Sequence, residues 1–162
     1  MAIYLKFGSV NGDVETEGYS KWIELGSCQF GAGRGISSPA GSAARREASA
    51  PSLSEVAVTK EFDQTSNAMF EAATAGTKGT KAEIAFTRSG VGTGSGKQIE
   101  LLRLTLEESL ISGYSMTSSG DRPTESLSLN YTKIELKYTP MTDAGGAGDP
   151  VTSTFDLTKM TA

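Results

Sequence analysis

Residues able to do acid–base or metal chemistry are few in this 162-residue sequence. It contains no histidine, and Cys28 is its single cysteine. Ser–His and Cys–His nucleophilic pairs are therefore impossible, and zinc sites of the usual Cys/His type are excluded. The carboxylates of Glu107–Glu108 and of Glu15 and Glu17 stand in solvated contexts, which argues against paired-carboxylate catalysis. The sequence predicts a protein that is not an enzyme, with no catalytic residue, metal or cofactor.

Three glycine-rich segments were compared with phosphate- and calcium-binding loops. Residues 92–97 superficially resemble a P-loop, but Val91 stands at the position of the first glycine and Gln98 replaces the magnesium-binding Ser or Thr. The apolar pattern that follows predicts a strand, not the helix that a P-loop needs. Residues 31–35 also lack a following helix, and residues 143–149 lack the ligand spacing of an EF-hand. All three segments are predicted to be loops.

Charge and hydropathy exclude several partners. The formal net charge is −4, and no basic cluster exceeds Arg45–Arg46. Such a chain is not attracted electrostatically to nucleic acid or to an anionic membrane surface. No apolar run approaches the ~20 residues of a membrane-spanning helix. The N-terminus lacks the basic region, the apolar region and the cleavage site of a signal peptide. The single cysteine, Cys28, is expected to be a buried structural thiol.

Alternating apolar and polar residues predict a mainly β chain. One helix is predicted at residues 64–76, where Thr65 or Ser66 can cap the first turn and Gly76 fits the position after the last. Met69, Phe70 and Ala73 form its expected apolar stripe. About eight strands and one helix predict a single domain, 1–162, built as a barrel or sandwich of antiparallel sheets. The predicted strands span residues 2–8, 22–30, 53–60, 80–88, 99–106, 123–138 and 151–157, and further β structure is predicted from 107 to about 116.

The long segment that follows Pro123 has an unusual alternation. Leu127, Leu129 and Tyr131 share one face, whereas the apolar residues of 134–138 lie one position out of phase. This slip predicts a β-bulge near residues 132–133. A strand of this length and bend suits a barrel wall, or an element that begins in one sheet and ends in another.

Two further segments are candidates for contacts with partners. Residues 31–52 contain mainly Gly, Ser, Ala and Arg, and a loop of this length inside a compact domain is usually functional or disordered. We interpret it as an extended, partner-binding arm. The turn at residues 121–125 carries Asp121, Arg122 and Glu125. One interpretation is a solvent-exposed turn that leads into a hairpin, in which Pro123 fixes the backbone angle φ. The other is an ion pair, within a subunit or between subunits, that fixes the register of the neighbouring strands.

With these elements placed, the chain resembles the haemolysin-coregulated protein (Hcp) family, the tube component of bacterial type VI secretion systems. The resemblance covers nearly the whole chain, and its most specific part is residues 121–131, Asp-Arg-Pro-Thr-Glu-Ser-Leu-Ser-Leu-Asn-Tyr, which looks like the family's late signature. The other matching pieces, in order, are Ile3–Phe7 with the Gly12–Asp13 turn, the 22–30 strand, the Gly/Ser/Ala arm, Val56–Lys60 and Asp63–Ser66.

The resemblance implies a β-barrel of two packed sheets with one lateral helix, which assembles into a six-membered ring with an open centre. Rings of this family stack into a tube that is propelled from the cell with toxins in its lumen or at its tip. The arm would then be a stacking element, ordered only when the next ring meets it, although its composition departs from the Gly/His/Met-rich arms of some relatives. Because the sequence stops at Ala162, we expect a plain tube subunit without a C-terminal toxin domain.

Partners and contact residues follow from the same resemblance. The implied partners are further copies of the chain, the type VI sheath and spike, and small effector proteins. The chain would reside in the bacterial cytoplasm and leave without a cleaved signal peptide, for the extracellular space or a target cell. Candidate contacts between subunits or rings are Arg34, Arg45, Arg46, Glu47, Asp121, Arg122 and Glu125. Candidate lumen residues are Ser112, Ser115, Thr117 and Ser118.

Other functions remain open at the level of sequence. One is a β-sandwich module that binds sugar or protein through exposed Trp22, Tyr4 or Tyr19, although such aromatic residues are more often core. Another is a tail-tube subunit of a contractile phage, which shares the architecture. A carboxylate hydrolase is disfavoured by the absence of histidine.

Overall fold

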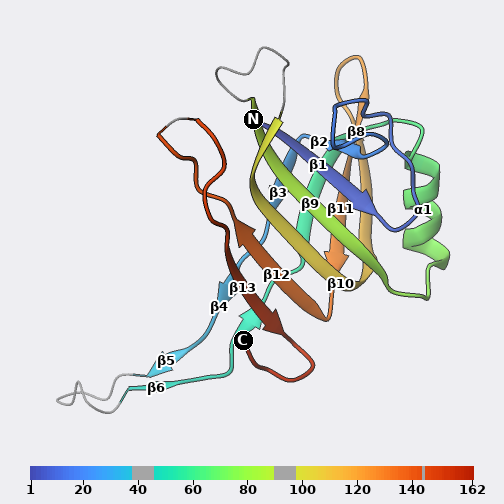
Figure 1. Ribbon diagram of the computed structural model, residues 1–162. Helices are drawn as coiled ribbons and strands as arrows, with labels where there is room; N and C mark the ends of the chain where they lie inside the picture. Colours follow the sequence, from blue (N-terminus) through green and yellow to red (C-terminus); the bar gives the residue numbers. More distant parts are fainter. Residues whose placement is uncertain (38–45, 90–97, 144) are drawn as a thin grey trace.

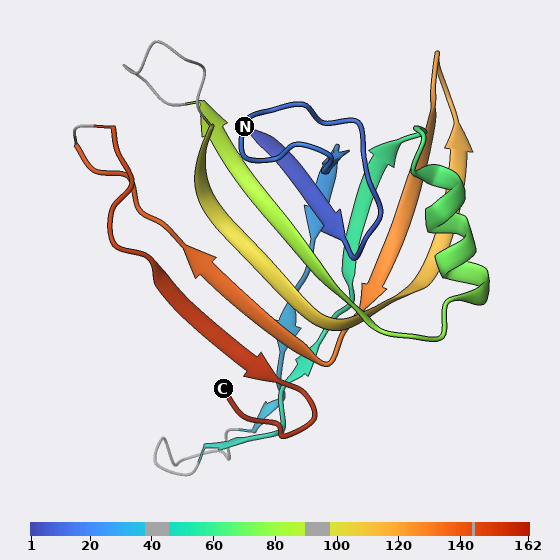
Figure 2. The same cartoon turned by 45° about the vertical axis from the view of Figure 1, so that its right-hand side comes forward.

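The computed structural model describes residues 1–37, 46–89, 98–143 and 145–162. The described part is mainly β, with one helix lying beside two packed antiparallel sheets (Figures 1 and 2). No helix within it is both long and apolar enough to cross a membrane. The elements are β1 (Ala2–Phe7), β2 (Ile23–Leu25), β3 (Ser27–Gln29), β4 (Ala32–Gly33), β5 (Ile36–Ser37), β6 (Glu47–Ala48), β7 (Ser52–Leu53), β8 (Val56–Glu61), α1 (Ser66–Ala75), β9 (Thr80–Ser89), β10 (Gln98–Ser118), β11 (Pro123–Asn130), β12 (Lys133–Tyr138) and β13 (Val151–Asp156).

Strand β10 joins the two sheets. Its first half pairs with β9 and β12, and its second half, from Leu110, pairs with β11. The register shifts once between Leu106 and Ser109 and again between Ile111 and Gly113, and Glu108 has a φ of 49°. These irregularities bend the 21-residue strand, so that it leaves one sheet and enters the other. The first sheet runs β2–β1–β9–β10–β12–β13 and the second β10–β11–β8–β3.

The predicted bulge in a continuous 123–138 strand is wrong, and the alternative of an element shared by two sheets is right. The segment divides into β11, which pairs with β10 and β8, and β12, which pairs with β10 and β13. Between them the Tyr131 hydroxyl donates to the Ser54 carbonyl at 2.8 Å, and the Thr132 N–H donates to the Glu107 carbonyl at 3.1 Å. The slip in alternation therefore marks a change of sheet.

The predicted 22–30 strand also divides between the sheets. Gly26 interrupts it, and its N–H donates to the Thr59 carbonyl at 2.7 Å. On one side β2 pairs with β1, and on the other β3 pairs with β8. The strand path β2–β1–β9–β10–β11–β8–β3 thus begins and ends on consecutive strands, which brings the two sheets together as a barrel.

The core lies between the sheets and follows the period-2 alternation. Inward-facing residues of β1, β9, β10 and β11, among them Leu5, Ile84, Leu104 and Leu129, are completely buried. Successive side chains of a strand point to opposite faces, so the residues between them face outward. The alternation that predicted the strands therefore also selects the core.

Helix α1 differs in detail from its prediction. Thr65 is the N-cap residue but makes no side-chain cap, and the Asp63 carboxylate instead accepts from the Thr65 N–H at 2.7 Å. Gly76 has a φ of −69°, so it is not in the left-handed region; a Cβ there would lie 2.3 Å from the Ala72 carbonyl oxygen. Met69 is buried, whereas Phe70 is exposed, so the expected apolar stripe is only partly covered.

The described part of the 31–52 segment forms an extended arm. It leaves the barrel as two short antiparallel ladders, β4 with β7 and β5 with β6 (Figure 1). Hydroxyls support these ladders, since the Gly31 N–H donates to Ser54 Oγ and the Gly35 N–H to Ser49 Oγ, both at 2.8 Å. Residues 38–45, and with them the predicted contact Arg45, lie outside the described residues, as does the whole glycine segment at 90–97.

Candidate functional site

A buried polar cluster connects α1 to the second sheet. Its centre is the ion pair between Lys60 of β8 and Glu125 of β11, with Nζ and Oε2 2.7 Å apart and both side chains completely buried. These residues are direct cross-strand partners. Lys60 Nζ also bonds Asp63 Oδ1 at 2.9 Å and Ser66 Oγ at 3.2 Å.

The remaining oxygen of Glu125 has its own donor. Tyr114 of β10 donates its hydroxyl to Oε1 at 2.5 Å, and Ser66 of α1 donates to Oε2 at 2.9 Å. Burial of the Tyr114 hydroxyl, together with the adjacent carboxylate, raises the pKa of Tyr114 to about 12. The Glu125 carboxylate therefore binds groups from β8, α1 and β10. These contacts hold α1 against the second sheet.

This geometry resolves the charged turn at 121–125. Glu125 belongs to the intrasubunit alternative, and its proposed contact with another subunit is wrong because its side chain is inaccessible. Arg122 and Asp121 are exposed, and Arg122 Nη1 lies 3.4 Å from Glu61 Oε2 in a solvated ion pair. Such exposed pairs contribute ~0–1 kcal/mol.

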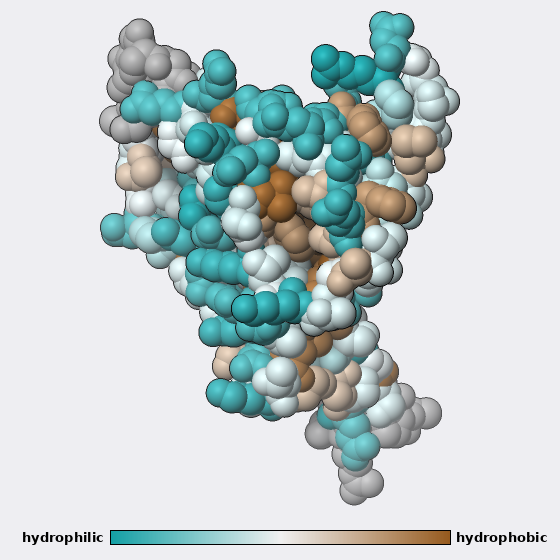
Figure 3. Space-filling model, turned by 90° about the vertical axis from the view of Figure 1, so that its right-hand side faces the viewer, coloured by the Kyte–Doolittle hydropathy of each residue, from teal (hydrophilic) through white to brown (hydrophobic). Residues whose placement is uncertain are grey.

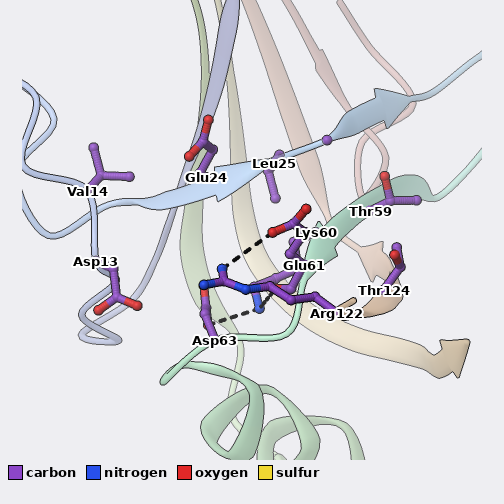
Figure 4. Close-up of a pocket in the computed structure, with 11 residues that line it drawn as sticks. Asp13, Val14, Glu24, Leu25, Thr59, Lys60, Glu61, Asp63, Arg122 and Thr124 are labelled. Carbon is purple, nitrogen blue, oxygen red and sulfur yellow. Dashed lines mark hydrogen bonds and ion pairs between the residues drawn. The ribbon is translucent and has the colours of Figure 1, made fainter. Parts of the chain in front are cut away.

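A cavity of about 520 Å³ opens beside this cluster (Figure 4). Its charged lining includes Asp13, Glu24, Glu61 and Asp63, together with Lys60 and Arg122. Both cations already have carboxylate partners. In the described ranges no three or more His, Cys, Asp or Glu side chains are grouped so that they could hold a metal ion.

The outward side of the second sheet is a continuous surface of hydroxyl side chains. Ser115, Ser126, Thr59 and Ser27 lie next to one another across β10, β11, β8 and β3. The neighbouring row on β10 and β11 pairs Thr117 with Thr124, and Ser128 pairs with Gly113. We call this surface the hydroxyl face, and its members are Ser27, Thr59, Ser115, Thr117, Thr124, Ser126 and Ser128.

Two of the four predicted lumen residues, Ser115 and Thr117, belong to the hydroxyl face. Ser112 is exposed near the β10 register shift, where its Oγ donates to Glu55 Oε2 at 2.7 Å, and Ser118 is the exposed last residue of β10. Sequence reasoning missed the other five members. For three of them the signal was present at 124–129, where Thr or Ser alternates with Glu or Leu.

The predicted contact residues do not form one site. Arg34, Arg46 and Glu47 are exposed on the arm, whereas the 121–122 turn lies at the opposite end of the molecule (Figure 1). Any contacts they make are therefore made at two separate surfaces.

The aromatic residues at 4, 19 and 22 form a packed cluster on the outer side of the first sheet. The rings of Tyr4 and Tyr19 are stacked with centroids 5.0 Å apart, and Trp22 meets Tyr19 edge-on at 5.2 Å. Tyr19 donates its hydroxyl to Glu100 at 2.9 Å, and burial together with this carboxylate raises the pKa of Tyr19 to about 12. Arg103 covers the Trp22 ring at 5.6 Å. Tyr4 and Tyr19 are buried, so the cluster offers no open platform for stacking a sugar.

Cys28 was expected to be buried, and it is half-buried in β3, where it packs against the core. Burial raises the pKa of its thiol to about 11. A thiol with so high a pKa is a poor nucleophile at neutral pH.

We expect the buried ion pair to respond asymmetrically to substitution. Glu125→Gln leaves Asp63 as the one carboxylate paired with the buried Lys60 ammonium, so the free energy of unfolding should fall by about 3 kcal/mol in urea titrations, the lower end of the range for a broken buried pair. The double variant Lys60→Met with Glu125→Leu removes both charges and should recover part of this loss. Glu61→Gln removes the carboxylate of the exposed pair and should cost less than about 1 kcal/mol. Equal losses for Glu125→Gln and Glu61→Gln would contradict this account.

Comparisons with known proteins agree with the architecture. The protein hcp1 of Pseudomonas aeruginosa is 29% identical over 102 residues, and the match spans 61% of this chain and 60% of that protein's length. A solved structure described as a type six secretion system protein superposes with a TM-score of 0.85 at 23% identity, covering 98% of this chain and 96% of the other. Hcp1 from Salmonella typhimurium superposes with a TM-score of 0.74 at 18% identity, covering 98% and 95%. At these identities the superpositions establish the shared fold.

The family itself is established by the sequence of the chain. Residues 4–138 match the family described as "Type VI secretion system effector, Hcp", which is most of the chain. The matched residues contain most of β1, all of β2 to β12, helix α1 and the Lys60–Glu125 pair. This chain therefore belongs to the Hcp family of type VI secretion proteins.

Proposed function

We propose that this chain is a tube subunit of a type VI secretion system. Copies assemble into six-membered rings with an open centre, and the rings stack into a tube that leaves the cell. Membership of the Hcp family, over residues 4–138, is the observation that carries the proposal. The barrel fold, shared over 98% of the chain with a type six secretion system protein, supports it.

The hydroxyl face suits the wall of the open centre. Its side chains are short and uncharged, and they stay hydrated without attracting one sign of charge. The outer side of the first sheet is different, because Lys81, Glu83 and Arg103 form ion pairs there and the aromatic cluster covers part of it. We place the hydroxyl face toward the bore and the charged side outward. Small effector proteins carried by the tube would then meet a wall of hydroxyl groups.

The arm supplies a contact along the tube axis. It extends from the barrel (Figure 2). Apart from the exposed Ile36, its described residues are mainly small or polar, and Arg34, Arg46 and Glu47 are exposed on it. Glycine, serine and alanine permit close backbone approach, and the three charged side chains add polar contacts. We place the next ring of the stack against this arm.

The wider role follows from the tube. Residues 1–162 act as one domain with no catalytic function, and the sheath, the spike and small effectors are its partners besides further copies of itself. The chain is made in the bacterial cytoplasm and exported as part of the tube. Neither nucleic acid nor a membrane is a partner, in keeping with the net charge of −4.

The first test is the mass of the native protein. Light scattering of the purified chain, with negative-stain images of the same peak, should give a mass six times the 16.9 kDa of one chain and ring-shaped particles. A monomer at every concentration tried would count against the tube subunit.

The orientation of the hydroxyl face can be tested by labelling. In a Cys28→Ser background, Ser126→Cys on the hydroxyl face and Lys81→Cys on the opposite, exposed side are each treated with biotin-maleimide. Both cysteines should be biotinylated in assembled rings, but streptavidin should capture only the Lys81→Cys rings, because the bore restricts its access. Equal capture of the two variants would place the hydroxyl face on the outside.

The arm has a separate test. Deleting residues 36–48 and closing the gap with two glycines removes β5 and β6 and leaves the β4–β7 ladder that joins the barrel. Rings should still form, whereas tubes and stacked pairs of rings in negative-stain images should be lost. Tubes that persist without these residues would remove the arm from the stacking contact.

A further inference from the structure

Strands β12 and β13 form a two-stranded extension of the first sheet, which we call the wing (Figures 1 and 2). Ile134, Leu136 and Tyr138 share its inner face with Phe155 and Val151, their cross-strand neighbours or near neighbours. Exposure rises along this face, from 6% at Ile134 to 51% at Tyr138 and 63% at Val151. The barrel therefore covers one end of the apolar face and leaves the other end open.

Among the strands that the structure describes, β13 pairs with β12 alone, so the outer strand of the wing is an edge. The Leu157 N–H donates to Thr132 beside β12, whereas the Asp156 N–H donates to Thr161 on the other side of the strand. By alternation, the N–H and C=O groups of Thr152 and Thr154 point away from β12. Edge strands are usually protected by charges, prolines or bulges, but residues 151–155 contain no charge and no proline. This edge has the features of a strand that pairs with another chain.

The opposite side of the barrel carries a second uncovered apolar surface, which we call the helix flank. It consists of Phe70 on α1, Met116 on β10 and Phe62 after β8, which are 52%, 55% and 38% exposed. The Phe70 ring packs edge-on against Tyr114 at 5.5 Å, and Met116 is two residues further along the same face of β10. Figure 3 shows hydrophobic side chains among polar ones on the side of the molecule that carries α1. Among the strands that the structure describes, β10 beyond Ser109 pairs with β11 alone, so a strand edge lies here too.

We propose that the wing of one copy docks on the helix flank of the next copy, so that the two surfaces form the head-to-tail contact within a ring. They differ from each other and lie on opposite sides of the barrel, as both ribbon views show. A contact between two unlike surfaces of one chain repeats from copy to copy and closes into a ring when the rotation allows it. Each surface combines exposed apolar side chains with an open strand edge. A second copy therefore supplies an apolar surface and a strand edge to each of them. This inference rests on the proposed ring and assigns its interface.

Two substitutions separate the surfaces. Val151→Arg places a charge on the wing, and Phe70→Arg places one on the helix flank, both at side chains that are more than half exposed. Each variant alone should lose the ring and run as a monomer in light scattering. An equimolar mixture should instead give a species of twice the chain mass, because the intact helix flank of the Val151→Arg chain accepts the intact wing of the Phe70→Arg chain. Ser20→Arg, in an exposed loop outside both surfaces, is the matched control and should keep the ring.

The outcomes distinguish this interface from the ring itself. The assigned interface would be overturned if each single variant still formed rings, or if the mixture of the two variants stayed monomeric. In either case the proposal that the chain is a tube subunit would stand. A wild-type chain that never forms rings would overturn both. Far-UV circular dichroism and the urea midpoint check that each variant is folded, and a variant that unfolds is replaced by its neighbour on the same surface. The replacements are Tyr138→Arg for the wing and Met116→Arg for the helix flank.

Discussion

The arrangement of this molecule depends on one buried carboxylate. Glu125 lies in the core phase of β11, where an isolated charge would be very costly, and the cost is met by the Lys60 ammonium and by two hydroxyls. Those partners come from β8, α1 and β10, so satisfying one charge fixes three elements at once. The helix lacks a side-chain cap of its own and buries few large residues, which makes this attachment its main specific contact.

The second sheet performs two tasks with a single strand pattern. In β11, Glu125, Leu127 and Leu129 face the core, and Thr124, Ser126 and Ser128 face outward. The inward set holds the barrel and the helix together, and the outward set builds the hydroxyl face. Because the two sets point to opposite faces, the outer surface is free for the proposed bore while the inner one serves stability. The wing and the helix flank are similar in one respect. Each is an apolar surface that begins in the core and extends beyond the part that the barrel covers.

Much of the fold could be predicted from the sequence, because local alternation records which face of a strand is buried. The segments at 2–7, 80–89 and 98–118 were placed almost to the residue, and residues 121–131 pointed to the family. The predictions were wrong where a segment expected to be one strand divides into two strands of different sheets. At Gly26 and at residues 131–132, the chain leaves one ladder for another, and the alternation alone does not distinguish this from a bulge. The Lys60–Glu125 pair was detectable in principle, because both charges occupy the buried phase of their strands.

The sequence by itself determined the class of protein, the strands and their faces, the arm, the absence of histidine chemistry and the family, since these depend on residue types and short-range periodicity. Tertiary structure decided which strands are neighbours. Only the register of β10, β11, β8 and β3 aligns Ser115, Ser126, Thr59 and Ser27 into one row, although they are separated by up to 99 positions in the chain. Only the same register brings Glu125 to Lys60, and only the bend of β10 leaves the wing uncovered. Contacts between distant residues are set by how the sheets pair and pack, and no local pattern encodes that pairing.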